Sequence, residues 1–311
     1  MFEPLFPETI DSTMVKAYKS CPRSFFHAHV EGRRLKEASI DLLAGGALAA
    51  GMEEVRSQLY AHGHDLAKAL SAGESVLAIH YGPDRPGEKK SLSRVLAAFR
   101  AYWTKWGPGS AEEMAPIEGG IEKRFSIPVA VGDKVINYSG RMDALCIEQG
   151  SMDPFTGKAD NTLWVVDEKT CSSMWSDWHS KYSLDCQMLG YAYAARQLGF
   201  PVEGVVIRAI NLGRKEFDPK QDLLQTKIRY SDKVLEDWYA DLGVTLEAMW
   251  GTFGSQSRFK GGSHKAYSQA FGNACTQYRG CSYRNLCLRM PAEPEWEEVR
   301  WNPLAEIKIE A

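Results

Sequence analysis

The sequence predicts an α/β fold in which a strand-rich middle is flanked by helices. Stretches that alternate between apolar and polar residues and are rich in Val and Ile, as strands are, gather between residues 117 and 230. Helical spacing of apolar residues dominates the first hundred residues and returns within and after the middle. The chain has 311 residues, 44% of them hydrophobic, so it can bury a large core, and its composition excludes collagen, a coiled coil and general disorder.

Helical patterns cover most of the N-terminal third. The expected helices span residues 12–30, 41–59, 64–80 and 90–106, and the stretch GPDRPGEKK is expected to be a loop. Pro22 breaks or restarts the first helix because it has no backbone N–H, and this would expose Cys21 at a junction. Glycines in the second helix permit a close approach of another backbone.

Strand patterns begin near Ile117. EKRFSIPVAV and KVINYSGRMDALCIEQ predict a hairpin around Gly132-Asp133, and LWVVDEKT, EGVVIRAINLG and TKIRY predict three more strands. The stretch SMDPFTGKADN, which precedes LWVVDEKT, is a turn-rich excursion. Helices are expected over residues 177–198 and 231–250, and the chain from Gly251 onward is expected to be irregular.

Asp167 and Lys169, in the strand VVDEKT, are the first candidates for chemistry. Side chains two residues apart on a strand share a face, so a carboxylate and an ammonium group stand side by side, and a neighbouring strand can add Asp143. Two carboxylates on adjacent strands suit hard cations such as Mg²⁺ or Mn²⁺, and a lysine there can stabilise charge at a phosphate. The plainer interpretation is a strand-end ion pair, with Asp143 in a turn.

The helix that follows this strand carries a second candidate pair. Gln187 and Tyr191, in CQMLGYAYA, are four residues apart and therefore lie on one helix face. Their polar groups could orient a phosphate or a base where the helix crosses the sheet. The plainer interpretation is an amphipathic helix with a buried tyrosine stripe.

Seven cysteines are the third feature, and three of them lie within CTQYRGCSYRNLC. An odd number of cysteines in a chain without a secretory signal argues against a disulfide framework. A metal or iron–sulfur site commonly needs four ligands, and Cys21, in a short polar motif, is the best distant candidate for the fourth. The alternative is that the C-terminal thiols are inert, as a buried thiol would be at the remaining positions, Cys146, Cys171 and Cys186.

Charge and hydropathy narrow the class of protein. A net charge of −3 disfavours a small nucleic-acid-binding module, which would be far more basic, and leaves open a nucleic-acid enzyme that holds metal with carboxylates. No apolar run approaches the ~18 residues of a membrane span, and the opening MFEPLFPETIDS lacks the pattern of a secretory signal. We therefore expect a cytoplasmic protein with no membrane partner.

The order of these motifs resembles that of the PD-(D/E)XK nuclease superfamily. The series is Cys21, Gly140-Arg-Met-Asp143, Asp167-Glu-Lys169, Gln187-x-x-x-Tyr191, and then Cys275, Cys281 and Cys287. The nearest likeness is to the iron–sulfur branch, the RecB-like and Cas4-like exonucleases. SCPRSFF at residues 20–26 resembles the N-terminal cysteine motif of that branch, and CSYRNLC at 281–287 resembles its closing C-x5-C. The resemblance runs from about residue 12 to residue 287.

The resemblance implies a restriction-endonuclease-like core with a central mixed sheet, a helical N-terminal part and a Cys-rich C-terminal segment that closes on the N-terminus. Asp143 and Asp167, with Glu168 beside them, would hold Mg²⁺ or Mn²⁺, Lys169 would be the catalytic lysine, and Gln187 and Tyr191 would form the helix motif beside the active site. Glu122, in IEKRFSI, resembles a glutamate often found upstream. A [4Fe–4S] cluster, or alternatively Zn²⁺, would be held by Cys21, Cys275, Cys281 and Cys287.

Two departures from the family pattern stand out. The family often has a histidine in a G-x-x-x-H motif on an early helix, where it completes the metal site, and the matching stretch here begins at Gly45 and ends in Ala49. The site is then one ligand short, unless another group or water replaces the histidine. The second departure is C-x5-C between Cys275 and Cys281, where the branch more often has C-x2-C, and this spacing keeps Zn²⁺ open as the alternative.

The sequence thus predicts one nuclease domain over residues 1–311, with a helical part over 12–116, an α/β catalytic core over 117–250, a Cys-rich segment over 251–290 and a tail over 291–311.

The predicted activity is that of a metal-dependent DNA exonuclease in recombination, repair or replication, in a bacterium or its phage. The alternative is a catalytically silent DNA-binding or scaffolding subunit. The expected partners are DNA with single-stranded ends and proteins of those pathways. Candidate DNA contacts, which could also be ordinary surface charges, are Arg33, Arg34, Lys36, Tyr278, Arg279, Tyr283, Arg284 and Arg289.

Overall fold

The computed structural model describes residues 3–36, 39–85, 87–148, 150, 161–174, 176–213, 216–260, 262–276, 280–290 and 296–304. The chain forms two compact units. The terminal unit comprises Met1–Ala38, Phe125–Gly140 and Lys233–Glu306, and the sheet unit comprises Ser39–Arg124, Arg141–Asp232 and Ile307–Ala311. Whether the chain functions as one nuclease domain stays a prediction.

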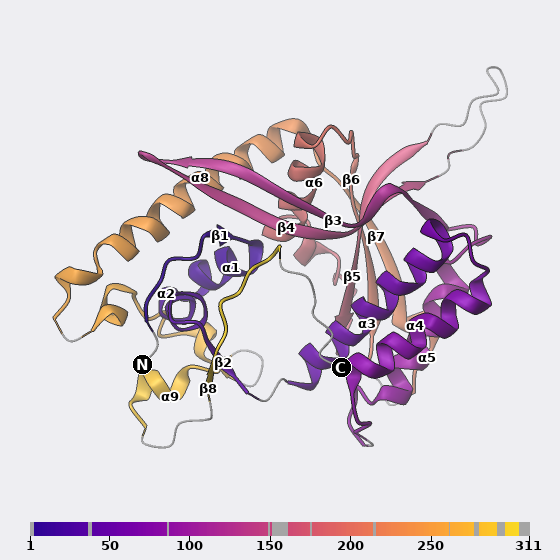
Figure 1. Ribbon diagram of the computed structural model, residues 1–311, viewed down its shortest axis with the longest axis horizontal. Coiled ribbons are helices and arrows are strands. Elements are labelled where there is room, and N and C mark those ends of the chain that lie inside the picture. The colour runs from indigo at the N-terminus through magenta and orange to yellow at the C-terminus, as the bar shows by residue number, and fades with distance from the viewer. Residues whose placement is uncertain are drawn as a thin grey trace. The chain divides into compact units, whose positions relative to one another are not determined.

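A six-stranded mixed β-sheet runs through the described residues, with the order β1-β4-β5-β6-β7 and with β3 paired to β4 (Figure 1). The strands β4 and β5 are antiparallel, β5 and β6 are parallel, and β6 and β7 are antiparallel. The parallel pair requires a crossover, which α6 provides. The strands are β1 (Thr9–Ile10), β3 (Met114–Val131), β4 (Lys134–Glu148), β5 (Thr162–Cys171), β6 (Gly204–Asn211) and β7 (Leu223–Arg229). The α/β class and the flanked central sheet are confirmed.

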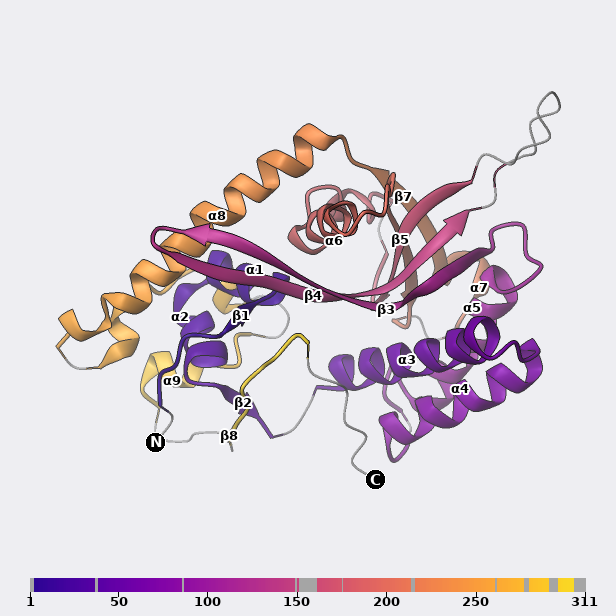
Figure 2. The ribbon, with the colours of Figure 1, turned by 45° about the horizontal axis from the view of Figure 1, so that its top comes forward.

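Helices cover both faces of the strands in the sheet unit. The bundle of α3, α4 and α5 buries its apolar side chains against Ile210, Leu212 and Leu223, and α6 packs on β5 and β6 from the other side (Figure 2). The first two helices of the bundle cross closely at Gly51 and Gly73, because a Cβ at Gly73 would lie only 2.9 Å from the Gly51 carbonyl oxygen. The helices of this unit are α3 (Ile40–Arg56), α4 (Leu66–Tyr81), α5 (Leu92–Trp106), α6 (Cys186–Gln197) and α7 (Pro219–Asp222).

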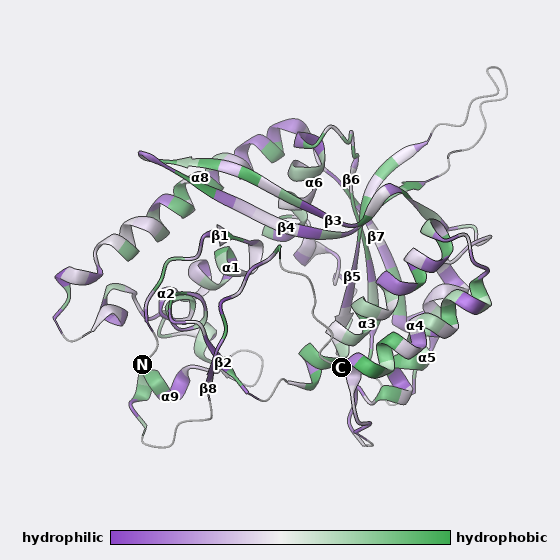
Figure 3. Cartoon of the chain, viewed as in Figure 1, coloured by the Kyte–Doolittle hydropathy of each residue, from purple (hydrophilic) through white to green (hydrophobic). Residues whose placement is uncertain are grey.

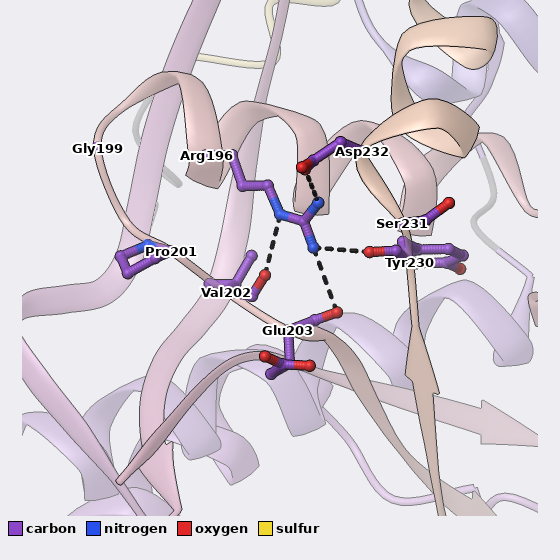
Figure 4. A pocket seen from close by; sticks show the side chains of 8 residues that line it. All are labelled: Arg196, Gly199, Pro201, Val202, Glu203, Tyr230, Ser231 and Asp232. Carbon is purple, nitrogen blue, oxygen red and sulfur yellow. Dashed lines mark hydrogen bonds and ion pairs between the residues drawn. The ribbon is translucent and has the colours of Figure 1, made fainter.

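The connection from α6 to β6 is fastened by one arginine. Figure 4 shows the guanidinium group of Arg196 donating to the carbonyl oxygens of Val202, Glu203 and Tyr230 and pairing with the Asp232 carboxylate at 2.6 Å. All of these groups line an open pocket. Because each nitrogen of the guanidinium already donates within the protein, we assign this pocket a structural role.

The terminal unit is built mainly from short elements around one long helix. In this helix, α8 (Asp232–Gly254), the buried positions recur at helical spacing, and Figure 3 shows hydrophobic and hydrophilic stretches alternating along it. A small antiparallel pair joins β2 (Arg33–Leu35) to β8 (Trp296–Glu298). The remaining elements include α1 (Ser12–Ser20), α2 (Pro22–Phe25), a π-helical turn (Phe26–Val30) and α9 (Arg284–Leu288).

One local expectation is confirmed and two are wrong. The helix expected over 12–30 is divided at Cys21, whose N–H donates to the Ala17 carbonyl and ends α1, as the position of Pro22 predicts. Cys21 is nevertheless buried, because its side chain lies in a cavity and not in solvent. The helix expected over 177–198 begins at Cys186, where the Asp185 side chain accepts a hydrogen bond from the Gln187 N–H and caps the helix.

The turn-rich excursion SMDPFTGKADN lies outside the described residues except for its last residue, Asn161. Among the described helices, none combines the length and the hydropathy needed to cross a bilayer.

Candidate active site

The register of β4 and β5 brings two carboxylates to the same place. Ala144 pairs with Val166 at the end of this antiparallel ladder, and the next position along both strands sets Asp143 opposite Asp167. Residues directly opposite each other in an antiparallel pair point to the same face of the sheet. Asp143 therefore lies in a strand and not in a turn, and its carboxylate stands on the face that carries Asp167.

Lys169 lies two residues beyond Asp167 on the same face. Its ammonium nitrogen is 2.8 Å from Oδ1 and 2.6 Å from Oδ2 of Asp167. Burial alone would lower the pKa of Lys169, but the charges of Asp167 and Asp143 outweigh burial, so its pKa lies above its usual value. Lys169 is thus a fixed positive charge beside two carboxylates, and it is not a proton acceptor at neutral pH.

A third carboxylate, Glu122, comes from β3. Its Oε2 lies 2.6 Å from Nε of Arg141, and its charge interacts with that of Asp143. The backbone of Glu122 has a φ of 48°, a left-handed conformation that costs free energy for a residue with a side chain. A strained residue at a cluster of charged groups is typical of functional sites.

The carboxylates carry more negative charge than the two cations beside them neutralise. Burial and the charge of Asp143 raise the pKa of Asp167, the Lys169 ammonium group opposes them, and the resulting pKa is about 7. Burial, followed by the charge of Asp143, raises the pKa of Glu122 to about 8. Burial and the charge of Glu168 also raise the pKa of Asp143. Oxygen ligands with this excess of negative charge are of the kind that Mg²⁺ and Mn²⁺ prefer, so the donor chemistry suits such an ion.

The side chain of Glu168 does not join this group. Because side chains alternate along a strand, its carboxylate points to the opposite face of the sheet, where it accepts hydrogen bonds from Arg56 and from the Tyr102 hydroxyl. Burial would raise the pKa of Glu168, but Arg56 and Tyr102 lower it below its usual value. The prediction that its carboxylate holds metal with Asp143 and Asp167 therefore needs correction. Only its backbone reaches the site, through an N–H that lies 3.1 Å from Oδ2 of Asp143.

The pair Gln187 and Tyr191 joins α6 to the strand that carries Asp143. The Gln187 amide donates to the Tyr191 hydroxyl at 2.8 Å, and this hydroxyl donates to the Arg141 carbonyl at 2.7 Å. These bonds hold α6 against β4 at Arg141, which lies two residues before Asp143 in the strand. The helix lies on the face of the sheet that carries the carboxylates. The pair therefore positions the strand, and its contact with a phosphate or base stays a prediction.

Ala49 occupies the position where the family pattern has histidine. It lies on the exposed side of α3, one turn after Gly45 and one turn before Glu53. A Cβ at Gly45 would lie 3.5 Å from Oγ1 of Thr170, and the charge of Glu53 acts on Glu122. The helix face that carries Ala49 thus lies between the end of β5 and the upstream glutamate, and at Ala49 it offers no donor atom.

Four cysteines line one cavity in the terminal unit. The cavity has a volume of about 160 Å³, and its lining includes Cys21, Cys275, Cys281 and Cys287. Burial raises the pKa of the Cys281 thiol, and the charges of the other three cysteines raise it further. The thiols are therefore neighbours in space, and a cavity between them fits a group that needs four sulfur ligands.

In the part of the chain that the structure describes, no three His, Cys, Asp or Glu side chains stand close enough together to hold a single metal ion. This applies to the carboxylates as well as to the cysteines, so the binding of metal at either place stays a prediction. The other cysteines lie elsewhere: Cys146 is buried in β4, Cys171 ends β5, and Cys186 begins α6.

The predicted DNA-contacting residues differ in how exposed their side chains are. Arg34, Lys36, Arg284 and Arg289 are exposed, whereas Arg33 pairs with Glu31 at 2.7 Å. Tyr283 is partly buried, and its ring stacks on Trp296. Tyr278 and Arg279 lie outside the described residues.

Sequence reasoning missed the partners that surround the carboxylates. Arg56, Tyr102 and Arg141 each contact a candidate site residue or its neighbour. The sequence offered one local signal for these partners, because Arg56 falls at the end of the apolar helix α3, at a position that the structure shows to be buried.

We expect Mn²⁺ binding to strengthen as the pH rises from about 6 to about 9. The pKa values of Asp167 (about 7) and Glu122 (about 8) lie above those of ordinary carboxyl groups, so the metal must displace protons, and affinity changes by up to about tenfold per pH unit for each proton displaced. The same shifts mean that the folded, metal-free protein binds more protons than the unfolded chain, so its stability falls as the pH rises through this range. Calorimetric titration in two buffers of different protonation enthalpy counts the protons released. Affinity that is independent of pH, with no proton release, would contradict the assignment.

No curated protein matches the chain significantly. Among solved structures it is similar to one titled "Crystal structure of SSO0001", with 14% identity over 76% of this chain and 85% of that chain, at a TM-score of 0.28, which is too low to carry an argument. The family model of the PD-(D/E)XK nuclease superfamily matches residues 12–288. The chain therefore belongs to the PD-(D/E)XK nuclease superfamily, whose members are nucleases that act on nucleic acid and typically use Mg²⁺ or Mn²⁺.

Proposed function

We propose that this protein is a metal-dependent DNA exonuclease of the RecB-like and Cas4-like branch. The observation that carries the proposal is the register of β4 and β5, which sets Asp143 opposite Asp167 one position beyond the Ala144–Val166 pair, with the Lys169 ammonium group 2.8 Å from Asp167. This arrangement places two metal-binding carboxylates and one fixed positive charge on the same face of the sheet.

Each of these residues would have a different role in phosphodiester hydrolysis. Asp143 and Asp167 would hold Mg²⁺ or Mn²⁺, with Glu122 beside them. When bound, such an ion acts as a Lewis acid and lowers the pKa of a bound water. The water oxygen bonds to phosphorus and gives up a proton, the bond between phosphorus and the oxygen of the leaving nucleoside breaks, and the leaving oxygen takes up a proton to become a hydroxyl group. Lys169 stabilises the charge that develops on the phosphate, because its ammonium group is already in place and stays protonated.

We infer a [4Fe–4S] cluster from the cavity that Cys21, Cys275, Cys281 and Cys287 share. These cysteines come from the two ends of the chain, so a cluster there would fasten the two ends together. Zn²⁺ bound by the same four thiols is the alternative.

The proposed substrate is DNA with single-stranded ends, in recombination, repair or replication. Exposed Arg34, Lys36, Arg284 and Arg289 are proposed phosphate contacts, since exposed guanidinium and ammonium groups neutralise the backbone. A cytoplasmic location suits these roles.

A second candidate function is that of a catalytically silent DNA-binding subunit. Ala49 favours it, because this side chain has no donor atom at the position where the family pattern has a histidine ligand. The grouping of Asp143, Asp167 and Lys169 opposes it.

Incubation of anaerobically purified protein with DNA, with and without Mn²⁺, tests the proposal. End-labelled linear DNA and closed circular DNA are compared. An exonuclease releases mononucleotides or short fragments from the linear substrate only with metal, and it leaves the circle intact. DNA binding without cleavage under any condition would favour the silent subunit, and cutting of the circle would show an endonuclease.

Restoring a histidine at position 49 is expected to tighten metal binding. The family pattern has a metal ligand at this position, and one added ligand should raise the affinity of the site that Asp143 and Asp167 form by about tenfold or more. Ala49→His should therefore lower the Mn²⁺ concentration for half-maximal cleavage and raise the rate. Calorimetric titration of Mn²⁺ into both forms measures the difference. Equal affinities would mean that residue 49 does not face the metal.

A further inference from the structure

A buried polar network lies on the face of the sheet opposite the carboxylates. At its centre the Glu168 carboxylate accepts hydrogen bonds from Arg56 of α3 and from the Tyr102 hydroxyl of α5, the latter at 2.5 Å. The side chains of Arg56 and Glu168 are 4% and 6% exposed, and Tyr102 is fully buried. Two helices are thus joined to one residue of β5 by groups that water hardly reaches.

A second arginine completes the network. Arg208 of β6 lies beside Glu168 in the parallel register, and its Nη1 donates to the Tyr102 hydroxyl at 3.1 Å. Its other nitrogens donate to the Gln225 side chain at 2.8 Å and to the Glu112 carbonyl at 2.9 Å. The Tyr102 hydroxyl is therefore held between a carboxylate that accepts its proton and an arginine that donates to it.

Such a network is a poor source of stability. Burying two guanidinium groups and one carboxylate removes them from water, and apolar side chains of similar volume would often be equally stable. What the network provides is a single arrangement of the groups it joins, because each donor and acceptor is matched.

Glu168 connects this network to the opposite face of the sheet. Its side chain is held by Arg56 and Tyr102, while its backbone N–H donates to Oδ2 of Asp143 at 3.1 Å. The position of the Glu168 backbone therefore decides how the Asp143 carboxylate is oriented.

We propose that Tyr102 and Arg56 are positioning residues for the metal site: by holding the Glu168 side chain, they keep its backbone N–H aligned on Asp143. This inference rests on the proposed function, in which Asp143 binds metal. Neither residue touches the substrate or the metal, so their removal should weaken metal affinity more than the rate at saturating metal.

Tyr102→Phe is the sharpest test, because it removes one hydroxyl and leaves every charge in place. The matched control is Tyr81→Phe, since Tyr81 is also buried in the helix bundle and its hydroxyl donates at 2.7 Å to the Lys90 carbonyl, with no link to Glu168. Tyr102→Phe loses the hydrogen bonds of this hydroxyl with Glu168, Arg208 and Arg56, and Tyr81→Phe loses one, so both should lower Tm, and Tyr102→Phe by more.

Mn²⁺ affinity, measured by calorimetry, separates the two variants. Tyr102→Phe should raise the Mn²⁺ dissociation constant by about tenfold, with the cleavage rate recovering at saturating Mn²⁺, whereas Tyr81→Phe should bind like the unaltered protein. Arg56→Lys, which keeps the charge and loses the planar fork, should weaken binding in the same way and serves if Tyr102→Phe fails to fold.

Unchanged affinity in Tyr102→Phe, or an equal loss in Tyr81→Phe, would overturn the positioning role while leaving the metal site intact. If the unaltered protein binds no Mn²⁺, the proposed metal site fails and the positioning role fails with it.

Discussion

Replacing Asp167 with Ala is expected to abolish metal-dependent DNA cleavage, with a loss of about a thousandfold or more in rate. The substitution removes a buried carboxylate that faces Asp143 across two strands, and with it half of the strand-borne metal site. Asp143→Ala and Lys169→Ala should have comparable effects, because the first removes the opposite ligand and the second removes the positive charge beside Asp167. Digestion of end-labelled DNA at saturating Mn²⁺ measures each loss.

Glu148→Gln is the matched control for these variants. Glu148 is another carboxylate of β4, but it lies on the opposite face from Asp143, where it pairs with Lys227. Its loss should leave the cleavage rate unchanged, and circular dichroism should show that all four variants keep the fold. If Asp143→Ala, Asp167→Ala or Lys169→Ala cuts at the unaltered rate, the active-site assignment is wrong.

The second large effect is expected from the cysteines that share a cavity. Serine in place of Cys21, Cys275, Cys281 or Cys287 should bleach a broad visible absorbance and make the protein poorly soluble. Structural metal sites contribute folding free energy directly, on the order of 10 kcal/mol for zinc in small domains, so the loss of one ligand destabilises the terminal unit. Absorption spectra and iron analysis of anaerobically purified variants measure the effect.

The remaining cysteines provide the comparison. Cys186→Ser, at the start of α6 and away from the cavity, should keep both colour and solubility, as should serine at Cys146 and Cys171. A colourless protein with stoichiometric zinc would exclude the iron–sulfur cluster and retain the four-thiolate site. Full colour in Cys21→Ser would remove the N-terminal cysteine from the site.

Local pattern predicted the parts of the site that depend on spacing along one element. Strand alternation placed Asp167 and Lys169 on one face, and helical spacing placed Gln187 and Tyr191 together, because both periodicities follow from backbone geometry alone. The turn at Gly132-Asp133 and the break at Pro22 were equally local. The same alternation rule, applied to Glu168, would have excluded its side chain from the metal ligands.

The start of α6 shows where local pattern fails. Apolar spacing extends the helix back to residue 177, but Asp185 caps it at Cys186, and Trp178 and Tyr182 pack edge to face in the preceding turns. A capping hydrogen bond and an aromatic contact outweigh a weak helical preference there.

The sequence by itself determined the fold class, the order of the strands along the chain and the family, because these depend on periodicity and on the order of motifs. Only the tertiary structure decided which groups meet. Register paired Asp143 with Asp167, and packing brought Arg56 and Tyr102 to Glu168 across 112 and 66 residues of chain. The cavity that joins Cys21 to the C-terminal cysteines is equally non-local. Contacts at such separations are set by how whole layers pack, and no single stretch of sequence carries that information.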